Sequence, residues 1–400
     1  MIKSWKKFSK FFLIASLVAI FAFLYCYKAI GLGLVNTDMY SHDQSAYMDY
    51  AKNMHKAKYS YIGGRNRMPV YPFLQSFLYQ PGMSDQEFFT QGKYFNVFLS
   101  LLLLFCLYLI FQKYLSLLYL VNITLIASFA VFASKAAYFQ AELLFYFLNF
   151  CSFLLMCKML KKPTWKLAII TGIVIGITHL TKASILPALI LFLLFSTFKM
   201  FFSKSRLISQ LINIVLVALA FLVIVYPYIS TSKRVFGSYF YNVNSTFYMW
   251  YDSWDEAVEG TRAHGDRIGW PNMPKKLIPG PKKYLKQHSA KQVLNRLWKG
   301  LLYLNSLCKQ NSYYKYVLIY SLLFLLITIS NLRQYIRLAK KHFFLLFFGL
   351  LYFISYLLLY AWYVPIAPGD RLILSQFVPY MFSISYVLSL TISKNKAAKL

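Results

Sequence analysis

The stretch that decides the fold is LAIITGIVIGITHLTKASILPALILFLLFSTFKMF, residues 167–201. A single helix of these 35 residues would be ~52 Å long, whereas the hydrocarbon layer of a bilayer is ~30 Å thick. The stretch must therefore break, and THLTKAS, residues 178–184, is the only polar place to do so. The helix before the break would rise only ~20 Å, so we expect the turn to lie below the outer surface, with Lys182 at the bottom of a pit.

The rest of the chain is just as apolar. Of its 400 residues 59% are hydrophobic and 20% aromatic, and the mean hydropathy is +0.50, far above the usage of soluble domains. This composition excludes a soluble protein and predicts an all-α polytopic membrane protein. About ten runs are long enough, or nearly so, to cross a membrane: 11–30, 94–111, 115–134, 138–157, 167–179, 183–201, 208–229, 312–330, 342–362 and 371–391.

The distribution of charge predicts how the chain is oriented. The first run follows MIKSWKKFSK and has no small-residue cleavage site, so we expect an uncleaved anchor in the cell membrane with a cytoplasmic N-terminus. Ten spans place both termini in the cytoplasm, and each short inner loop then carries Lys or Arg, as the positive-inside rule requires. All 12 Asp and Glu fall on the outer side or at the outer end of a span. Carboxylate chemistry is therefore expected outside the cytoplasm, and topology and lipid headgroups explain about half of the net charge of +31 without nucleic acid.

Two outer segments, roughly 32–92 and 230–311, are too long to be simple connectors. They divide the chain into an N-terminal membrane module over 1–229, an extracytoplasmic loop region over 230–311, and C-terminal membrane helices over 312–400. In the first segment Ala46, Tyr50, Met54 and Ala57 recur at helical spacing, which predicts an amphipathic helix on the membrane surface. A proline-rich bend and a second short apolar helix follow.

The second segment differs in composition from the spans around it. DSWDEAVEG, residues 252–260, predicts a short helix begun by an Asp or Ser cap, and GDRIGWPNMP, residues 265–274, predicts an ordered irregular loop. The indole rings here either stack on a sugar or seal the loop against the membrane; they are those of Trp250, Trp254 and Trp270.

DQSAYMDYAKNM followed by GRNRMPVYPFL resembles the first outer loop of C-class (GT-C) glycosyltransferases, the users of polyprenyl-phosphate sugars that include protein mannosyltransferases and the lipid A aminoarabinose transferase. The matching residues are Asp43, Tyr47, Ala51, Pro69, Tyr71 and Pro72. Further similar segments follow in the order of that family: AELLFYFLNF with Glu142, GIVIGITHLTKASILPAL with Lys182, VIVYPYISTSKRVFG, and GDRLILSQFVPY with Arg371. The chain departs from the family at Gln44, where Glu is frequent, and at Leu372, where Tyr is frequent.

The resemblance implies a GT-C-like fold and an inverting transfer of a sugar from a polyprenyl-phosphate donor to an extracytoplasmic glycan, lipid or protein. Asp43 would be the general base, and the second outer segment, 230–311, would recognise the acceptor, because the donor features lie elsewhere. One carboxylate suffices for this chemistry, because the phosphate leaves as an anion and needs no acid, whereas a glycosidase uses two carboxyl groups. Alternatively, Asp43 only caps the surface helix, or Asp38 is the base.

The other candidate residues each have a structural alternative. Lys182 would hold the donor phosphate or would snorkel to the headgroups, and Glu142, a few residues into a span, would shape the cavity or pair with Lys135. Arg371 would contact the phosphate or anchor a helix end. Arg65 and Arg67 most resemble loop charges that face lipid phosphates, although Arg67 is kept as a substrate-binding candidate together with Tyr47. His179 is expected to line the pit.

No cofactor is predicted, and no metal site, because His42 beside Asp43 lacks further ligands at a supporting spacing. Other classes remain open: a transporter or flippase of lipid-linked sugars, a polymerase or ligase of lipid-linked glycans, and a non-enzymatic assembly factor. A transporter would have charges at mid-membrane and repeat symmetry between its halves, whereas the ionisable residues here gather at the outer face.

Overall fold

The computed structural model describes residues 2–202, 207–263, 274, 276–310 and 312–397. Within these ranges the chain is helical and contains no β-strand. The first part of the chain forms α1 (Ile2–Val35), η1 (Ser41–Asp43), α2 (Gln44–Lys56), α3 (Val70–Ser76), α4 (Asp85–Phe111), α5 (Leu117–Ile126), η2 (Ala127–Phe132), α6 (Ala133–Ala136) and α7 (Glu142–Lys161). The middle forms α8 (Trp165–Thr181), η3 (Ala183–Ile185), α9 (Leu186–Phe201), α10 (Leu207–Phe236), α11 (Val243–Thr246), η4 (Tyr248–Trp250) and α12 (Trp254–Ala263). The last part forms α13 (Pro281–Gln287), α14 (Ala290–Gln310), α15 (Ser312–Ser330), α16 (Leu332–Lys341), α17 (Phe343–Tyr363), η5 (Ile373–Gln376) and α18 (Phe377–Ala397).

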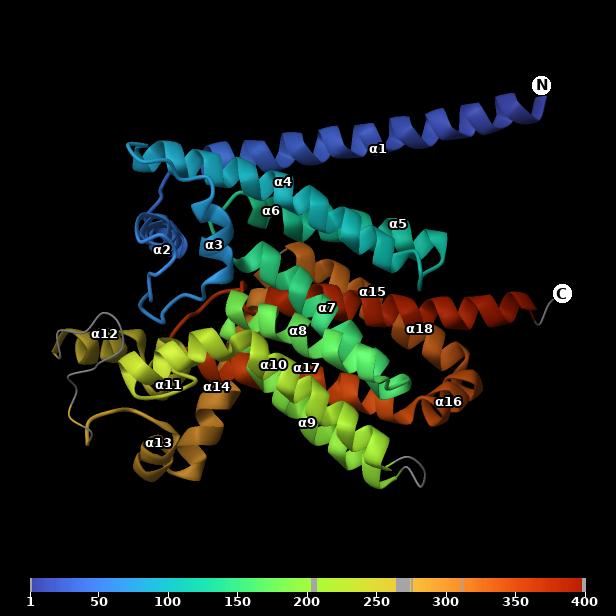
Figure 1. Ribbon diagram of the computed structural model, residues 1–400. Coiled ribbons are helices and arrows are strands. Elements are labelled where there is room, and N and C mark those ends of the chain that lie inside the picture. The colour runs from blue at the N-terminus through green and yellow to red at the C-terminus, as the bar shows by residue number, and fades with distance from the viewer. Residues whose placement is uncertain (1, 203–206, 264–273, 275, 311, 398–400) are drawn as a thin grey trace.

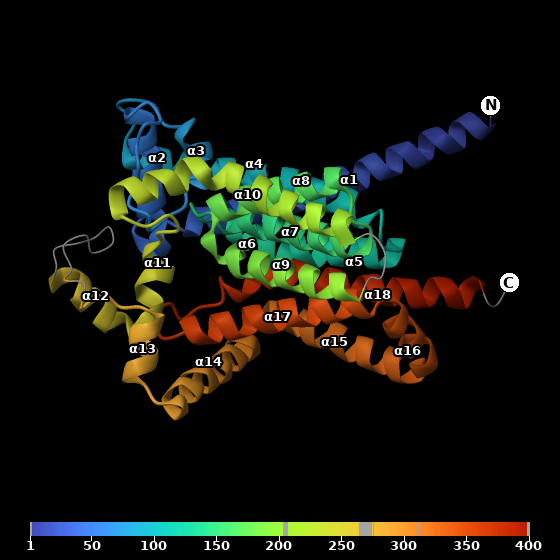
Figure 2. The ribbon, with the colours of Figure 1, turned by 60° about the horizontal axis from the view of Figure 1, so that its bottom comes forward.

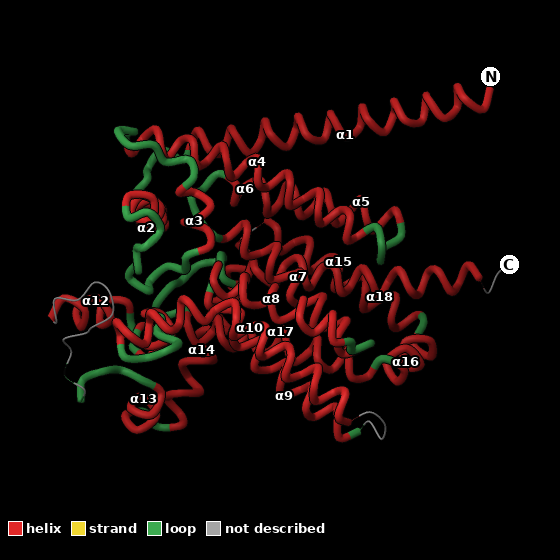
Figure 3. The backbone as a smooth tube through the Cα atoms, viewed as in Figure 1, coloured by secondary structure: helices red, strands yellow, loops and turns green. Residues whose placement is uncertain are grey.

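The long helices form a bundle with two different ends. The short helices α2, α3, α11, α12 and α13 gather at one end, which we call the loop end (Figure 1, Figure 2). The start of α1 and the end of α18 both lie at the opposite end (Figure 1), where α16 carries Arg333, Arg337, Lys340 and Lys341. Most of the irregular backbone also lies at the loop end (Figure 3). The bundle thus separates its carboxylates from a basic end, as the charge pattern predicts.

The chain is an all-α polytopic membrane protein. In the described part of the chain, eight helices are long and apolar enough to cross a membrane. A ninth span results if α15 and α16 count as one, although they meet at 102°. The remaining predicted run corresponds to α8, which is apolar but has only 17 residues.

The predicted break within residues 167–201 is confirmed. α8 ends at Thr181, Lys182 has an extended backbone with φ −157° and ψ 126°, and η3 and α9 follow. Pro187 stands in the first turn of α9, where its missing N–H removes no helical hydrogen bond. The break therefore places a cationic side chain between two apolar helices, close to the loop end.

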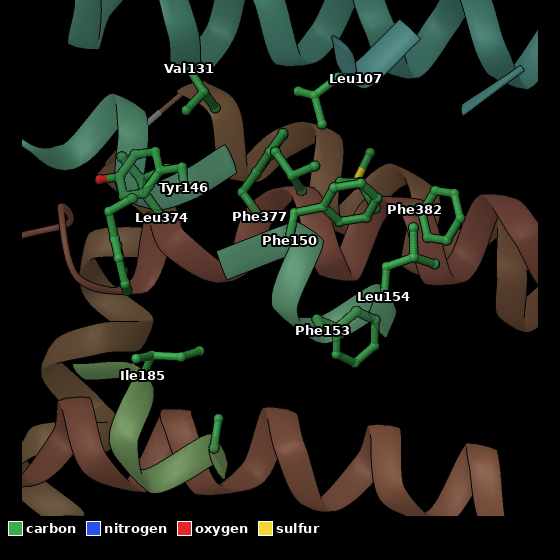
Figure 4. Close-up of a cluster of buried hydrophobic side chains, with 14 of the residues drawn as sticks. Leu107, Val131, Tyr146, Phe150, Phe153, Leu154, Ile185, Leu374, Phe377 and Phe382 are labelled. Atoms are coloured by element: carbon green, nitrogen blue, oxygen red, sulfur yellow. The ribbon is translucent and has the colours of Figure 1, made fainter. Parts of the chain in front are cut away.

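Small residues let α8 pack closely on α10, its neighbour in both ribbon views (Figure 1, Figure 2). A Cβ built on Gly172 would lie 2.4 Å from the carbonyl oxygen of Val217, and one on Gly176 would lie 2.8 Å from the side chain of Ile224. Glycines four residues apart are a frequent means of close helix contact in membranes. Aromatic and aliphatic side chains fill the rest of the core, including Phe150 of α7 between Phe377 and Phe382 of α18 (Figure 4).

The surface helix is present but lies differently from the prediction. α2 buries Tyr47, Tyr50, Ala51 and Met54 within the protein. Tyr47 and Ala51 belong to a core cluster with residues of α3 and the start of α4, and the ring of Tyr50 lies 5.5 Å from that of Tyr61. Tyr47 and Ala51 lie beside the predicted stripe and make the apolar face of α2 wider, and α3 packs on this wider face. The expectation that α2 lies on the membrane by this face is therefore wrong.

The described residues of 230–311, the predicted second outer segment, are folded against the bundle. Ser253 caps α12, since its Oγ accepts a hydrogen bond from the amide of Glu256 at 3.1 Å, as predicted. The segment 265–274 lies outside the described residues except for Pro274. α14 belongs to the bundle, because Leu304 and Leu307 join the main core and Gly300 meets the backbone of Ala361 in α17.

Candidate functional site

The Asp43 carboxylate does not cap α2. Asp43 stands at the N-cap position with left-handed backbone angles, φ 69° and ψ 10°, and its side chain makes no capping hydrogen bond. His42 before it is also left-handed, with φ 54°, a conformation that Asp and His tolerate better than most residues. The two consecutive left-handed residues turn the carboxylate away from the helix. The alternative that Asp43 serves only as a cap is thus excluded.

Two arginines from distant parts of the chain hold the Asp43 carboxylate instead. Arg67 Nη2 lies 2.5 Å from one oxygen, and Arg371 Nη1 donates a hydrogen bond of 2.7 Å to the other. Burial works against the charge of this carboxylate, but the guanidinium groups of Arg67 and Arg371 outweigh it and keep the pKa of Asp43 below its usual value. Asp43 is therefore ionised at neutral pH.

The buried amide of Gln44 fixes the turn that presents Asp43. Its Oε1 accepts hydrogen bonds from the amide of Phe139 at 2.9 Å and from Asn36 Nδ2 at 2.8 Å, and its Nε2 donates to the carbonyl of Asp38 at 2.9 Å. Gln44 has no exposed surface. A carboxylate could accept these bonds but could not donate one, so the departure from the Asp-Glu pattern has a local reason.

The expectation that Arg65 and Arg67 face lipid phosphates is wrong. Arg65 is only 2% exposed, and its guanidinium donates to Ser232 Oγ at 2.7 Å and to the carbonyl of Tyr228 at 3.2 Å in α10. This contact joins the loop between α2 and α3 to α10 and thereby positions the neighbouring Arg67. Asn66 assists, because its side-chain oxygen accepts a hydrogen bond of 2.6 Å from Arg67 Nη1.

A second ion pair lies deeper in the same region. Lys182 Nζ is 2.7 Å from Glu142 Oε1, and Glu142 is only 2% exposed. Glu142 is the first residue of α7, at the start of the span and not some residues into it. Lys135, the alternative partner of Glu142, lies 3.8 Å from Asp370. Glu142 therefore balances the charge of Lys182. The ammonium group of Lys182 lies against this carboxylate and does not extend to the lipid headgroups.

α7 also positions the backbone that carries Arg371. The hydroxyl of Tyr146 donates to the carbonyl of Arg371 at 2.6 Å, and Asn149 Nδ2 donates to the carbonyl of Ser375 at 2.8 Å. Glu142 and Asp43 more than offset the effect of burial, so the pKa of Arg371 lies above its usual value. Arg371 is thus a fixed cation under the influence of two carboxylates.

All seven candidate residues line one cavity of about 290 Å³. They are Asp43, Tyr47, Arg67, Glu142, His179, Lys182 and Arg371. Its other wall is apolar and comes from the membrane helices, with Leu186, Pro187, Ile190 and Ile229 in α9 and α10 and Leu359 in α17. Ile190 is 50% exposed, so the apolar end of the cavity reaches the outer surface of the bundle. A polar end and an apolar end in one cavity suit an amphiphilic ligand.

Tyr47 and His179 occupy the walls of the cavity. Tyr47 is 5% exposed and its ring lies 5.6 Å from the guanidinium of Arg67, which suits a cation–π contact. Burial raises the pKa of Tyr47, so the hydroxyl stays neutral. His179 lies edge-on against the rings of Phe221 and Phe240 and lines the pit as predicted.

Some cavity residues were not expected from the sequence. Ser184 follows the break after α8, lines the cavity and places its hydroxyl oxygen out of solvent contact. Within the described part of the chain no partner is found for this oxygen, for Glu142 Oε2 or for Arg67 Nε. Unpaired buried polar atoms are costly, and their presence around one cavity points to a polar ligand. The polar segment THLTKAS was the only available signal for Ser184.

Asp38 and His42 do not take part in this arrangement. The carboxylate of Asp38 accepts a hydrogen bond from the amide of Tyr40 at 2.9 Å, as in a local turn, and Asp38 does not line the cavity. Among the described residues no three His, Cys, Asp and Glu lie close enough together to hold a metal ion. Independence from metal remains a prediction.

Comparison with known proteins adds no family to these observations. No family model, no curated protein and no solved structure matches the chain significantly. Its function must therefore be inferred from the cavity itself and from the resemblance of its motifs.

Proposed function

We propose that the protein is an inverting GT-C-like glycosyltransferase that moves a sugar from a polyprenyl-phosphate carrier to an acceptor. The observation that carries the proposal is the shared cavity of Asp43 and Lys182. One end offers a carboxylate among cations, and the other offers apolar helix surface open at Ile190. A lipid phosphate linked to a sugar has the matching order of groups, which are an isoprenoid chain, an anion and a polar ring.

Each group has a role in the proposed reaction. An acceptor oxygen bonds to the anomeric carbon of the sugar while the bond from that carbon to the phosphate oxygen breaks. The electron pair of the broken bond leaves with the phosphate, and the acceptor proton passes to Asp43. Lys182 and Arg371 stabilise the charge that develops on the phosphate, which is the larger energetic contribution. Glu142 fixes Lys182 for this role, and Tyr47, Arg67 and His179 complete the binding cavity.

The donor phosphate and Asp43 compete for the same arginine. An ionised carboxylate with a lowered pKa is a weak base, so the resting arrangement favours charge over proton acceptance. A phosphate that binds Arg371 draws positive charge away from Asp43 and raises the basicity of the carboxylate. The base thus becomes effective only when the donor is in place.

The proposed orientation follows from the charge distribution. The basic end with both termini faces the cytoplasm, and the loop end, which carries Asp43, faces the outside of the cell membrane. No cofactor is required in this mechanism. The acceptor is a glycan, lipid or protein outside the cytoplasm.

The test uses purified protein in nanodiscs and a panel of radiolabelled polyprenyl-phosphate sugars. Loss of a positioned base costs typically 10²- to 10⁴-fold in rate, so Asp43→Asn should transfer label at least ~100-fold more slowly. Asp38→Asn is the matched control, because this carboxylate lies five residues earlier and outside the cavity. It should transfer label at the wild-type rate.

Two outcomes would overturn the proposal. Equal rates for wild type and Asp43→Asn would remove Asp43 from the mechanism. Movement of a lipid-linked sugar across a liposome membrane without transfer to any acceptor would identify a transporter instead.

A further inference from the structure

A second cavity lies in the folded outer segment, beyond the first. Its volume is about 350 Å³, and its walls come from η4, the first turns of α12 and the residues around α13. The half-buried rings of Trp250 and Tyr251 supply aromatic surface, and Asp252, Glu256 and Gln287 supply polar groups. Tyr284 also lines the cavity but is only 3% exposed. Met249, the residue before Trp250, lines the first cavity. One short helix therefore separates the two cavities.

The floor of this second cavity is held rigidly. The Asp252 carboxylate accepts hydrogen bonds from Tyr284 Oη at 2.6 Å and from Arg296 Nη1 at 3.1 Å, and His288 Nε2 lies 2.8 Å from its other oxygen. The ring of His288 stacks on that of Tyr284 at 3.9 Å. Trp250 is held as well, since its Nε1 donates to the carbonyl of Ser245 at 3.1 Å and its ring lies 6.3 Å from that of Tyr284. Side chains fixed before a ligand arrives lower the cost of binding.

The same contacts tie the second cavity to the first. Arg296 donates to the carbonyl oxygens of Trp362 at 3.1 Å and of Met249 at 3.2 Å, and Trp362 Nε1 also donates to Met249 at 2.9 Å. The next residue, Tyr363, lines the first cavity and donates to Asn244 Oδ1 at 2.9 Å. The end of α17 thus fixes the two cavities relative to each other, at the loop end of the bundle.

We infer that this second cavity binds a neutral sugar unit of a glycan acceptor. The C–H face of a pyranose ring packs well on the negative face of an aromatic ring, and the carboxylates and the amide can accept or donate hydrogen bonds to its hydroxyl groups. Arg296 pairs with the carboxylate of Asp252 at 3.1 Å, and Lys283 lines the cavity together with Glu256, so the cavity has no strong preference for an ion. The inference rests on the proposed function in that it makes the acceptor a glycan.

Binding can be tested without any transfer reaction. The wild-type protein is placed in phosphatidylcholine nanodiscs, because the sugar headgroups of maltoside detergents would compete. Saturation-transfer NMR then reports contact with maltohexaose, cellohexaose and chitohexaose, and with a hyaluronan hexasaccharide as an anionic comparison. We expect at least one neutral oligosaccharide to bind, and to bind better than the anionic one.

Two substitutions fill the cavity from different sides. Gly280 has an extended backbone, with φ 176°, and open space where a Cβ would stand, so Gly280→Tyr places a ring in the cavity without backbone strain. Gln287→Phe does the same from an exposed position on α13. Each should weaken oligosaccharide binding at least tenfold. Leu285→Tyr adds a ring on the same helix at a 60% exposed position outside the cavity and should leave binding unchanged.

The outcomes separate this inference from the proposed function. Asp43→Asn should bind the oligosaccharide like wild type, since Asp43 is not part of this cavity. Absence of binding to every neutral oligosaccharide at millimolar concentration would overturn the inference, and so would binding by both filled variants as strong as that of the wild type. Either result would leave sugar transfer to a lipid or protein acceptor intact. Binding that is blocked as expected, in a protein that transfers no sugar, would instead overturn the proposed function.

Discussion

Asp43 and Arg371 lie 328 residues apart in the sequence and are joined by a hydrogen bond of 2.7 Å. The contact closes the bundle at its loop end, because it links the turn before α2 to the segment between α17 and η5. It also lowers the affinity of the Asp43 carboxylate for a proton, which opposes the proton transfer proposed for this residue. The site is therefore arranged so that a competing anion changes the basicity of its carboxylate.

The first prediction concerns the pH dependence of turnover. Asp43 has a lowered pKa, so its ionised form persists at all pH values above its usual pKa of about 3.9. Arg371→Gln removes a positive charge beside Asp43, while the carboxylate remains largely buried. Both conditions favour the protonated form, so the pKa of Asp43 should rise. The acid limb of the plot of kcat/KM against pH should then move to higher pH than in wild type. Arg371→Lys keeps the charge and is the matched control. An acid limb at the same pH in wild type and Arg371→Gln would show that Asp43 does not control turnover.

The ion pairs of Asp43 should also make the stability of the fold depend on pH, and stability, like turnover, should fall in acid. A group with a lowered folded-state pKa stabilises the fold above its unfolded pKa, and this stabilisation is lost as the pH falls through the folded value. The clamp between Asp43 and the two arginines should therefore be unaffected by pH from 5 to 8 and should weaken only in stronger acid.

The second prediction concerns the buried ion pair. Lys182→Met leaves Glu142 charged and buried without its partner, which should destabilise the fold by ~3 kcal/mol. The double variant Glu142→Gln with Lys182→Met removes both charges and should regain most of that stability, as measured by thermal unfolding in detergent. It should still transfer sugar poorly, because the cation for the phosphate is gone. A double variant as unstable as Lys182→Met alone would show that the two side chains are not energetically coupled.

The third prediction concerns Gln44. Gln44→Glu, as in the family pattern, places a carboxylate opposite the carbonyl of Asp38, where the amide now donates at 2.9 Å. A buried unpaired charge and a lost donor should cost ~3 kcal/mol at neutral pH. Because burial raises the pKa of the introduced carboxyl, part of the lost stability should return as the pH falls to 5. Gln86→Glu, in the exposed first turn of α4, is the control and should be neutral or slightly stabilising. Equal unfolding temperatures for both variants would contradict the role given to Gln44.

The sequence predicts the helices and the break at Lys182 well, because apolar length and helix rise are local properties. It does not predict which charged side chains form ion pairs with each other. Glu142 has lysines on either side in sequence, and only the packing of α7 against α8 selects Lys182. Arg65 and Arg67 are two residues apart in the sequence, and nothing local distinguishes them. Arg65 is buried against α10 and Arg67 faces the cavity, because contacts with distant parts of the chain fix the conformation of this loop. The stripe of α2 is misplaced for the same reason, since it depends on the position of α3.

The last prediction concerns the close contact of α8 and α10, which holds Lys182 at its depth. Gly172→Leu forces a side chain against the backbone of Val217, 2.4 Å from the position of its Cβ, and overpacking of this kind costs roughly 1–3 kcal/mol. The unfolding temperature should fall, and the shift of α8 should displace Lys182 and weaken donor binding. Gly349→Leu in α17 is the matched control, since no atom lies within 4 Å of its Cβ position, and the gain in helix propensity should make it neutral or slightly stabilising. Wild-type stability and donor affinity in Gly172→Leu would show that α8 is free to move, and that Lys182 is not positioned by this contact.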